Sequence, residues 1–220
     1  MSVSSELNKM WKLASDPEFR AMKRQVKAFR AAHGRGTPER YEGLSPGDVV
    51  LDVGGYHGDW ADRMTALYGV TVHAFEPHPR FAQMMTDRFE GRADVHVHDF
   101  AMGAEAGTLA LSDDENASSA LVAAGPQVTG AILPVADVFE ELDLAEIKVV
   151  KMNIEGGEYD LLPAMIEAGL MGRVDRLTVQ FHNYGAGQIE AREAIRDGLS
   201  RTHACVWEYP FIWEEWARKP

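Results

Sequence analysis

One stretch, residues 48–60 with the sequence Asp-Val-Val-Leu-Asp-Val-Gly-Gly-Tyr-His-Gly-Asp-Trp, constrains the fold more than any other part of the chain. Its apolar run at 49–53 is long enough for one buried strand. Three glycines follow, at 54, 55 and 58, and a helical pattern begins near Asp59. A buried strand that leads through a glycine-rich turn into a helix is how an open α/β sheet builds a nucleotide-binding cleft. The stretch therefore predicts an α/β protein with a ligand at this turn.

The rest of the chain repeats this alternation of strand and helix patterns. Segments with a strand pattern lie at 70–76, 94–99, 147–153, 174–181, 203–209 and 211–216, and helical spacing recurs at 58–68, 79–89, 136–142, 159–168 and 189–201. Between 101 and 134 the pattern loosens, and we expect a hairpin-like insertion with extended pieces at 108–111 and 119–122. Up to residue 99 the order β-α-β-α-β is typical of the mononucleotide-binding half of a doubly wound fold.

The N-terminal 40 residues differ from the rest in pattern and charge. Residues 5–33 have helical spacing with a break before Pro17, so we expect an N-terminal helical arm, 1–40, ahead of one ligand-binding domain, 41–220. The arm contains nine Lys or Arg and four acids, a charge of +5, which leaves −17 on the domain because the net charge is −12. We interpret the basic arm as a solvated helix face. The acidic domain disfavours nucleic acid as a substrate, because it would repel a phosphate backbone.

The composition narrows the class of protein further. The 220 residues are 45% apolar and 25% charged, which is typical of a soluble globular protein. No apolar run approaches the roughly 20 residues that a membrane helix needs, and the N-terminus lacks the layout of a signal peptide. Cys205 is the only cysteine, so no internal disulfide forms. We expect a cytoplasmic protein that does not bind membranes.

An acid at the end of the second strand adds to the predicted ligand site. Glu76 follows Asp52 by 24 residues, and from there a carboxylate can accept hydrogen bonds from both hydroxyls of an adenosine ribose. A dinucleotide requires Gly-x-Gly-x-x-Gly, but Tyr56 stands where the second glycine would be. The pattern Asp52-x-Gly54-x-x-x-Gly58 with Glu76 instead suits S-adenosylmethionine (SAM), which has no phosphate. A glycine-rich turn without a ligand is the alternative.

Asp99 and Phe100, at the end of the strand at 94–99, lie where an adenine would be bound. Asp99 is placed to accept a hydrogen bond from the adenine amine, and Phe100 to pack on the ring. The alternative is an ordinary strand end with an aspartate that caps a helix.

The second distinctive stretch, residues 148–162, begins as a strand and ends as a helix. Asn153, Glu155 and Glu158 gather at the carboxyl end of this predicted central strand, where ligands bind in open α/β sheets. A helix N-terminus favours acids and so explains Glu158, but it explains the other two residues less well.

Three segments together resemble the FkbM-type methyltransferases: residues 52–58, 73–79 and 151–158, the last reading Lys-Met-Asn-Ile-Glu-Gly-Gly-Glu. The resemblance covers about residues 45–185. It implies a class I Rossmann-like three-layer sandwich with a mostly parallel seven-stranded sheet and an antiparallel last strand. It also implies a SAM-dependent enzyme that methylates a hydroxyl of a small molecule such as a sugar or a natural product. The residues then expected to bind the cofactor are Asp52, Gly54, Gly55, Tyr56, Gly58, Glu76, Asp99, Phe100 and Asn153.

The chain departs from the family pattern at two acids. Asn153 stands where the family usually has Asp, and Gln180 stands where its fifth strand often has Glu. The first change weakens a role of position 153 as a base or as a carboxylate ligand to a metal, but it leaves Glu155 and Glu158 in place. Together the two changes suggest an altered acceptor or a reduced activity.

Methyl transfer to an alcohol requires a base near neutral pH, because the hydroxyl must lose its proton. Our first candidate is His182 at the end of the strand at 174–181, followed by Glu155, with Asn153 beside them; His57 in the glycine turn is a third candidate base. For each histidine, an ordinary hydrogen-bonded side chain is the alternative. We expect no metal, although Asn153, Glu155, His182 and Asn183 form a minority candidate for a divalent cation, which prefers more carboxylate than that.

Three functional classes remain open from the sequence. An O-methyltransferase comes first, a non-catalytic SAM-binding or interaction module second, and an NAD-linked oxidoreductase third, the last disfavoured by Tyr56. The aromatic cluster near the C-terminus allows a core, a homodimer interface or a wall of the acceptor site, and we expect core or interface. That cluster consists of Trp207, Tyr209, Phe211, Trp213 and Trp216.

Overall fold

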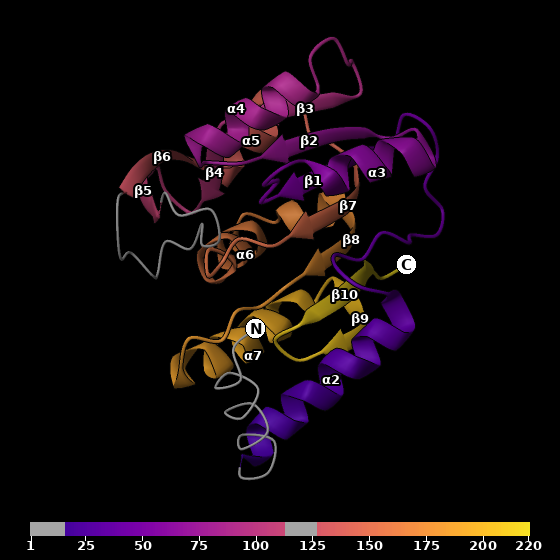
Figure 1. The fold of residues 1–220 in the computed structure, drawn as a ribbon, viewed down its shortest axis with the longest axis vertical. Coiled ribbons are helices and arrows are strands. Elements are labelled where there is room, and N and C mark those ends of the chain that lie inside the picture. Colours follow the sequence, from indigo (N-terminus) through magenta and orange to yellow (C-terminus); the bar gives the residue numbers. More distant parts are fainter. Residues whose placement is uncertain (1–15, 113–126) are drawn as a thin grey trace, which may run out of the picture. The chain divides into compact units, whose positions relative to one another are not determined.

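The computed structural model describes residues 16–112 and 127–220 (Figure 1). These residues belong to two compact units that meet in the sequence between Pro38 and Glu39. In the first unit, helix α2 spans Pro17–His33. The Asp16 side chain caps it by accepting a hydrogen bond of 2.9 Å from the backbone N–H of Phe19. The predicted helix start at Pro17 is confirmed; the predicted helical residues 5–15 lie outside the described residues.

The second unit is built on a seven-stranded sheet. In chain order its strands are β1 (Val49–Val53), β2 (Thr71–Phe75), β3 (Val95–His98), β7 (Ile147–Met152), β8 (Val174–Val179), β9 (His203–Tyr209) and β10 (Trp213–Arg218). They lie in the order β3-β2-β1-β7-β8-β10-β9, with β10 antiparallel to both of its neighbours and the remaining pairs parallel. The predicted class I Rossmann-like fold, mostly parallel with an antiparallel last strand, is confirmed.

Helices cover both faces of this sheet and complete the predicted three layers. The helices are α3 (Asp59–Tyr68), α4 (Pro79–Arg88), α5 (Val135–Glu141), α6 (Glu158–Glu167) and α7 (Ala186–Leu199), with a short 3-10 helix at Leu170–Arg173. Side chains alternate along a strand, so Val50 packs with buried residues of α3 and α4, and Leu51 packs with those of α5, α6 and α7. The carboxyl ends of β1, β2 and β7 therefore lie at one edge between two buried cores.

A second sheet lies at this edge, and the sequence predicted only part of it. Its strands are β4 (Phe100–Gly103), β5 (Gly107–Ser112) and β6 (Gln127–Pro134), in the order β4-β6-β5. The predicted extended piece at 108–111 is confirmed as β5, whereas β4 and β6 were not predicted. The other predicted piece, 119–122, lies outside the described residues.

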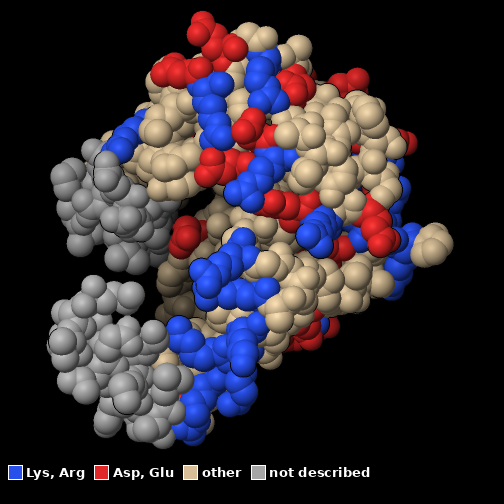
Figure 2. All heavy atoms as spheres, turned by 45° about the vertical axis from the view of Figure 1, so that its right-hand side comes forward, with Lys and Arg blue, Asp and Glu red and all other residues tan. Residues whose placement is uncertain are grey.

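Charged side chains are distributed unevenly in Figure 2. Basic residues gather along α2, and they are Arg20, Lys23, Arg24, Lys27 and Arg30. Elsewhere on the visible face, blue and red side chains alternate. Within the ranges 16–112 and 127–220, no helix is both long enough and apolar enough to cross a membrane.

Candidate active site

Backbone hydrogen bonds hold the glycine turn between β1 and α3 to the end of β2. The N–H groups of Gly54 and Gly55 both donate to the carbonyl of Phe75, at 3.0 and 3.1 Å. Tyr56 has a left-handed φ of 51°, and its N–H donates to Oε2 of Glu76 at 2.9 Å. The turn and Glu76, which the sequence predicted to act together, are therefore joined directly.

Glu76 is buried at the end of β2 with both carboxylate oxygens in use. Its Oε1 accepts a second backbone hydrogen bond, 2.9 Å long, from the N–H of His78. Burial raises the pKa of Glu76, although the two backbone N–H groups act against this rise by stabilising the carboxylate. Because each carboxylate oxygen has two acceptor sites, the group can still accept hydrogen bonds from a ligand.

A buried ion pair lies beneath the turn, on the face of the sheet that α3 covers. Lys151 Nζ donates to Asp52 Oδ1 and to the carbonyl of Gly54, each at 2.7 Å. The side chains are 5% and 0% exposed. A Cβ at Gly54 would overlap the carbonyl oxygen of Asn153, so this glycine makes room for β7 and not for a ligand. Sequence reasoning missed Lys151, although a lysine inside the apolar run at 147–152 was a visible signal.

The other two glycines of the turn face α4. A Cβ at Gly55 would lie 2.9 Å from the sulfur of Met85, and a Cβ at Gly58 would lie 2.5 Å from the Phe89 ring. Both distances are too short for real side chains. The glycine spacing is therefore explained by how closely the turn packs on the protein, and the evidence for a ligand must come from other groups.

A cavity of about 260 Å³ opens beside the turn, between the strand ends of the main sheet and the second sheet. Gly54, Glu76, Asn153 and Glu155 line it on the side of the main sheet. Apolar side chains of the second sheet line the opposite side: Met102, Leu109, Leu111 and Ile132. Within the described residues, Asp52 Oδ2 and Asn153 Oδ1 are buried oxygens without a hydrogen-bond partner, so both are available as acceptors.

Carboxylates surround His182 at the end of β8, next to this cavity. Its Nε2 lies 3.4 Å from Glu155, and its Nδ1 lies 3.1 Å from Glu158. Glu158 is fully buried and also accepts the backbone N–H of His182 at 2.8 Å. Tyr184 donates its hydroxyl to Glu155 at 3.0 Å. The structure thus brings together His182 and Glu155, the first two of the three candidate bases, and adds Glu158 as a fixed partner of the ring.

The charges in this cluster determine the protonation state of His182. Burial lowers the pKa of the ring, but hydrogen bonds to Glu155 and Glu158 outweigh it and raise the pKa to about 9. The hydrogen bond to His182 in turn lowers the pKa of Glu155. At neutral pH the ring is therefore an imidazolium, and it can act as a base only after it has lost a contact or a proton.

The remaining candidates lie around the edge of the site. Asp99 is exposed between β3 and β4, and the half-buried Phe100 packs its ring at 5.7 Å from that of Phe75; neither lines the cavity, so their adenine contacts stay a prediction. The His57 ring stacks on Tyr56 at 3.7 Å and does not line the cavity either.

Two features of the described part of the chain concern possible sites elsewhere. No three His, Cys, Asp or Glu side chains there are arranged to hold a metal ion. A larger cavity of about 700 Å³ lies between α6 and α7, away from the strand ends, and its lining is mostly apolar.

Comparison with known sequences supports one chemistry. A family model described as the methyltransferase FkbM domain matches residues 52–201. The 31-O-demethyl-FK506 methyltransferase FkbM of Streptomyces tacrolimicus is 27% identical to this chain, and the match covers 64% of this chain and 67% of that protein.

Comparison with solved structures supports the fold. An rRNA methylase from Streptococcus thermophilus superposes with a TM-score of 0.51 at 12% identity, over 80% of this chain and 90% of that one. The METTL16 methyltransferase domain gives a TM-score of 0.50 at 11% identity, over 93% and 82%. At such low identities the likeness concerns the fold alone.

Proposed function

The chain belongs to the FkbM methyltransferase domain family, and we propose that it uses SAM to methylate a hydroxyl of a small molecule such as a sugar or a natural product. One observation carries the proposal. A single cavity is lined by Glu76, the expected ribose ligand, and by Glu155, whose carboxylate contacts His182. A group expected to bind the nucleoside and a group that can move a proton are thus both within reach of a ligand in this cavity.

The residues present fit SAM. The Glu76 carboxylate would accept the ribose hydroxyls, as two charge-assisted hydrogen bonds. Asn153 Oδ1, buried and without a partner in the described residues, would accept from the ammonium of the amino-acid end. The first turn of α3 presents backbone N–H groups at a positive helix end, which suits the carboxylate. When bound, SAM would supply an electrophilic methyl group, which is bonded to its sulfonium sulfur.

The chain's own residues position the acceptor and move its proton. Glu158 holds Nδ1 of His182, so the other nitrogen, Nε2, faces Glu155. The Glu155 side chain is 43% exposed and is the partner that an incoming hydroxyl can displace. When Glu155 leaves, the pKa of the ring falls, so a larger fraction of the molecules has a neutral ring that has given its proton to water. Nε2 then accepts the proton of the hydroxyl, with Glu158 stabilising the imidazolium that forms.

The acceptor class follows from the charge around the cavity. Its polar lining consists of acids and an amide, with no Lys or Arg among the described lining residues. Carboxylates accept hydrogen bonds from hydroxyls but repel phosphates, so a neutral polyhydroxylated molecule fits better than RNA. The RNA methylases among the similar structures share the fold alone with this chain.

Turnover tests the proposal. The purified protein is incubated with SAM and a panel of hydroxylated small molecules, and formation of S-adenosylhomocysteine is measured. His182→Gln should lower the rate by about 100-fold while the Kd for SAM stays unchanged. SAM binding without turnover on any acceptor would favour the second candidate, a non-catalytic SAM-binding module. Two observations make it the second candidate: both ring nitrogens of His182 already contact carboxylates, and position 153 has an amide. An unchanged rate in His182→Gln would exclude His182 as the base.

A further inference from the structure

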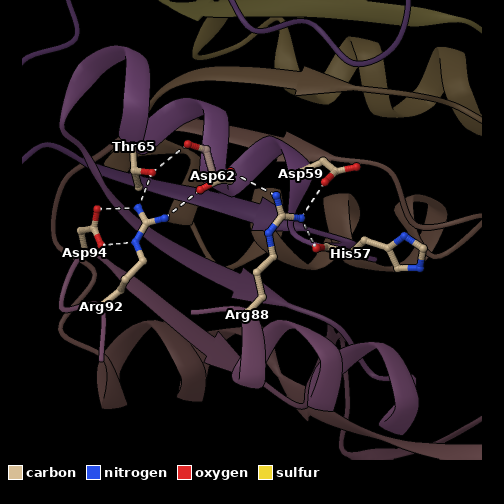
Figure 3. Close-up of polar contacts among 7 residues, drawn as sticks. All are labelled: His57, Asp59, Asp62, Thr65, Arg88, Arg92 and Asp94. Carbon is tan, nitrogen blue, oxygen red and sulfur yellow. Dashed lines mark hydrogen bonds and ion pairs between the residues drawn. The ribbon is translucent and has the colours of Figure 1, made fainter. Parts of the chain in front are cut away.

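A surface network of hydrogen bonds and ion pairs joins α3 to α4 and takes no part in the proposed mechanism (Figure 3). Arg88, in the last turn of α4, donates from Nη1 to the carbonyl of His57 at 2.8 Å and to Asp59 Oδ1 at 2.6 Å. Its other terminal nitrogen, Nη2, donates to Asp62 at 3.1 Å. Arg88 therefore contacts the backbone of the glycine turn itself, at the end that leads into α3.

Arg92 lies beside Arg88 in the same network but contacts different groups. It donates to Asp62 at 2.7 Å and to the Thr65 hydroxyl at 2.6 Å, and it forms a double hydrogen bond with Asp94. These partners lie in the body of α3 and before β3, so within the described residues the side-chain hydrogen bonds of Arg92 end on groups outside the turn (Figure 3). The two arginines thus carry the same charge and have similar exposure, 35% and 32%, but only Arg88 reaches the turn.

The opposite end of the turn is held in the same way. Lys151 donates to the carbonyl of Gly54, so cationic groups fix the carbonyls at both ends of the segment 54–57. A fixed carbonyl fixes the whole planar peptide unit, including the N–H on its other side. At His57 that unit continues into the N–H of Gly58, at the start of α3.

One face of α4 supports the segment between these two ends. Phe81 packs against the rings of Tyr56 and His57, at 4.6 and 5.2 Å. Met85 and Phe89 fill the spaces that the glycines of the turn leave open. These three residues and Arg88 recur at helical spacing, so they share one side of the helix. The same helix begins just after Glu76, the expected ribose ligand.

We propose that Arg88 is a positioning residue, which acts through the His57 carbonyl to set the turn for the amino-acid end of SAM. This inference rests on the proposed function. The ion pairs of Arg88 are largely exposed to solvent, so they contribute little to the free energy of unfolding. A charged donor to a backbone carbonyl is nevertheless a strong hydrogen bond, and its loss lets the turn sample other shapes that bind the ligand less well.

The test compares two variants and two ligands by calorimetry. Arg88→Ala should raise the Kd for S-adenosylhomocysteine roughly tenfold. Arg92→Ala should leave this Kd unchanged, although it should lower the Tm by at least as much as Arg88→Ala does. Methylthioadenosine lacks the ammonium and the carboxylate, so its Kd should rise by less than about twofold in Arg88→Ala. A general structural defect would weaken both ligands equally. Arg88→Gln, which keeps an N–H donor, should recover part of the binding.

The outcomes separate this inference from the proposed function. If the wild-type protein does not bind S-adenosylhomocysteine, the proposed function fails first. If it binds, equal losses in the Arg88 and Arg92 variants, equal losses for both ligands, or an unchanged Kd in Arg88→Ala each overturn the role of Arg88. Should Arg88→Ala not fold, the same comparison is made between Arg88→Gln and Arg92→Gln, where a selective loss supports the role and equal binding overturns it.

Discussion

Glutamine in place of Glu155 keeps the size of the side chain and removes a negative charge 3.4 Å from His182 Nε2. In the wild-type protein the pKa of His182 is raised to about 9. An opposite charge at this distance moves a pKa by roughly 1 to 3, and the exposure of Glu155 places its effect at the lower end because water screens it. We expect the pKa of His182 to fall to roughly 8, a change of about 1.4 kcal/mol.

The same substitution changes how stability depends on pH. The pKa of His182 in the folded protein lies above its ordinary value of 6.5. The stabilisation is therefore fully present below about pH 6.5 and is lost as the pH rises through about 9. We expect the free energy of unfolding of the wild-type protein to fall across this window. In Glu155→Gln the fall should be smaller by about 1.4 kcal/mol.

Proton NMR measures the pKa directly, because ring protons of histidine shift as the ring titrates. The spectrum of His182→Gln assigns the signal, and Glu141→Gln, an exposed acid at the end of α5, controls for the loss of one charge. Urea unfolding from pH 6 to 10 measures the stability. The reasoning fails if His182 titrates near 6.5 in the wild-type protein, or if its pKa stays near 9 in Glu155→Gln.

Three further predictions concern the turn and the buried pair. Gly54→Ala should destabilise the protein by about 3 kcal/mol more than Gly91→Ala, because both glycines have positive φ but only the first faces a backbone carbonyl; urea unfolding of both variants checks this. Lys151→Met should cost about 3–5 kcal/mol by leaving Asp52 buried without its partner, and much less when combined with Asp52→Asn, as a double-mutant cycle will measure. Glu76→Gln should weaken SAM binding by about 100-fold in calorimetry, and it should also lower the Tm, because one of the two backbone N–H groups that the carboxylate accepts would then face an amide NH2 group; unaltered affinity would exclude Glu76 as the ribose ligand.

The sequence was sufficient to predict the main sheet because its signals are local. The central strands β1 and β7 are mostly apolar runs, and β1 to β3 alternate with clear helical patterns. β6 was not predicted, and Gly130 interrupts the pattern of its sequence. In the structure, a Cβ at Gly130 would overlap the carbonyl of Pro77. A tertiary contact therefore requires glycine at this position, and no local sequence pattern shows that contact.

The sequence was sufficient to predict several residues of the candidate site but not their hydrogen bonds or protonation states. Glu76, Glu155 and His182 were identified from their positions at strand ends, and the structure brings the last two together. The protonation state of His182 depends on the buried Glu158, which the sequence placed near the site without showing which atom it would hold. Lys151 was overlooked because a lysine in a buried strand is interpretable only when its partner, 99 residues away, is known.

The contact between Gly54 and the carbonyl of Asn153 has a consequence for how such chains diverge. The two distinctive stretches of the sequence, 52–58 and 151–158, meet at this point and share the ion pair beside it. A side chain at position 54 requires β7 to withdraw, and that movement would carry Asn153 and Glu155 with it. The two motifs should therefore change together over evolutionary time, and a relative without glycine at position 54 should have a remodelled acceptor side.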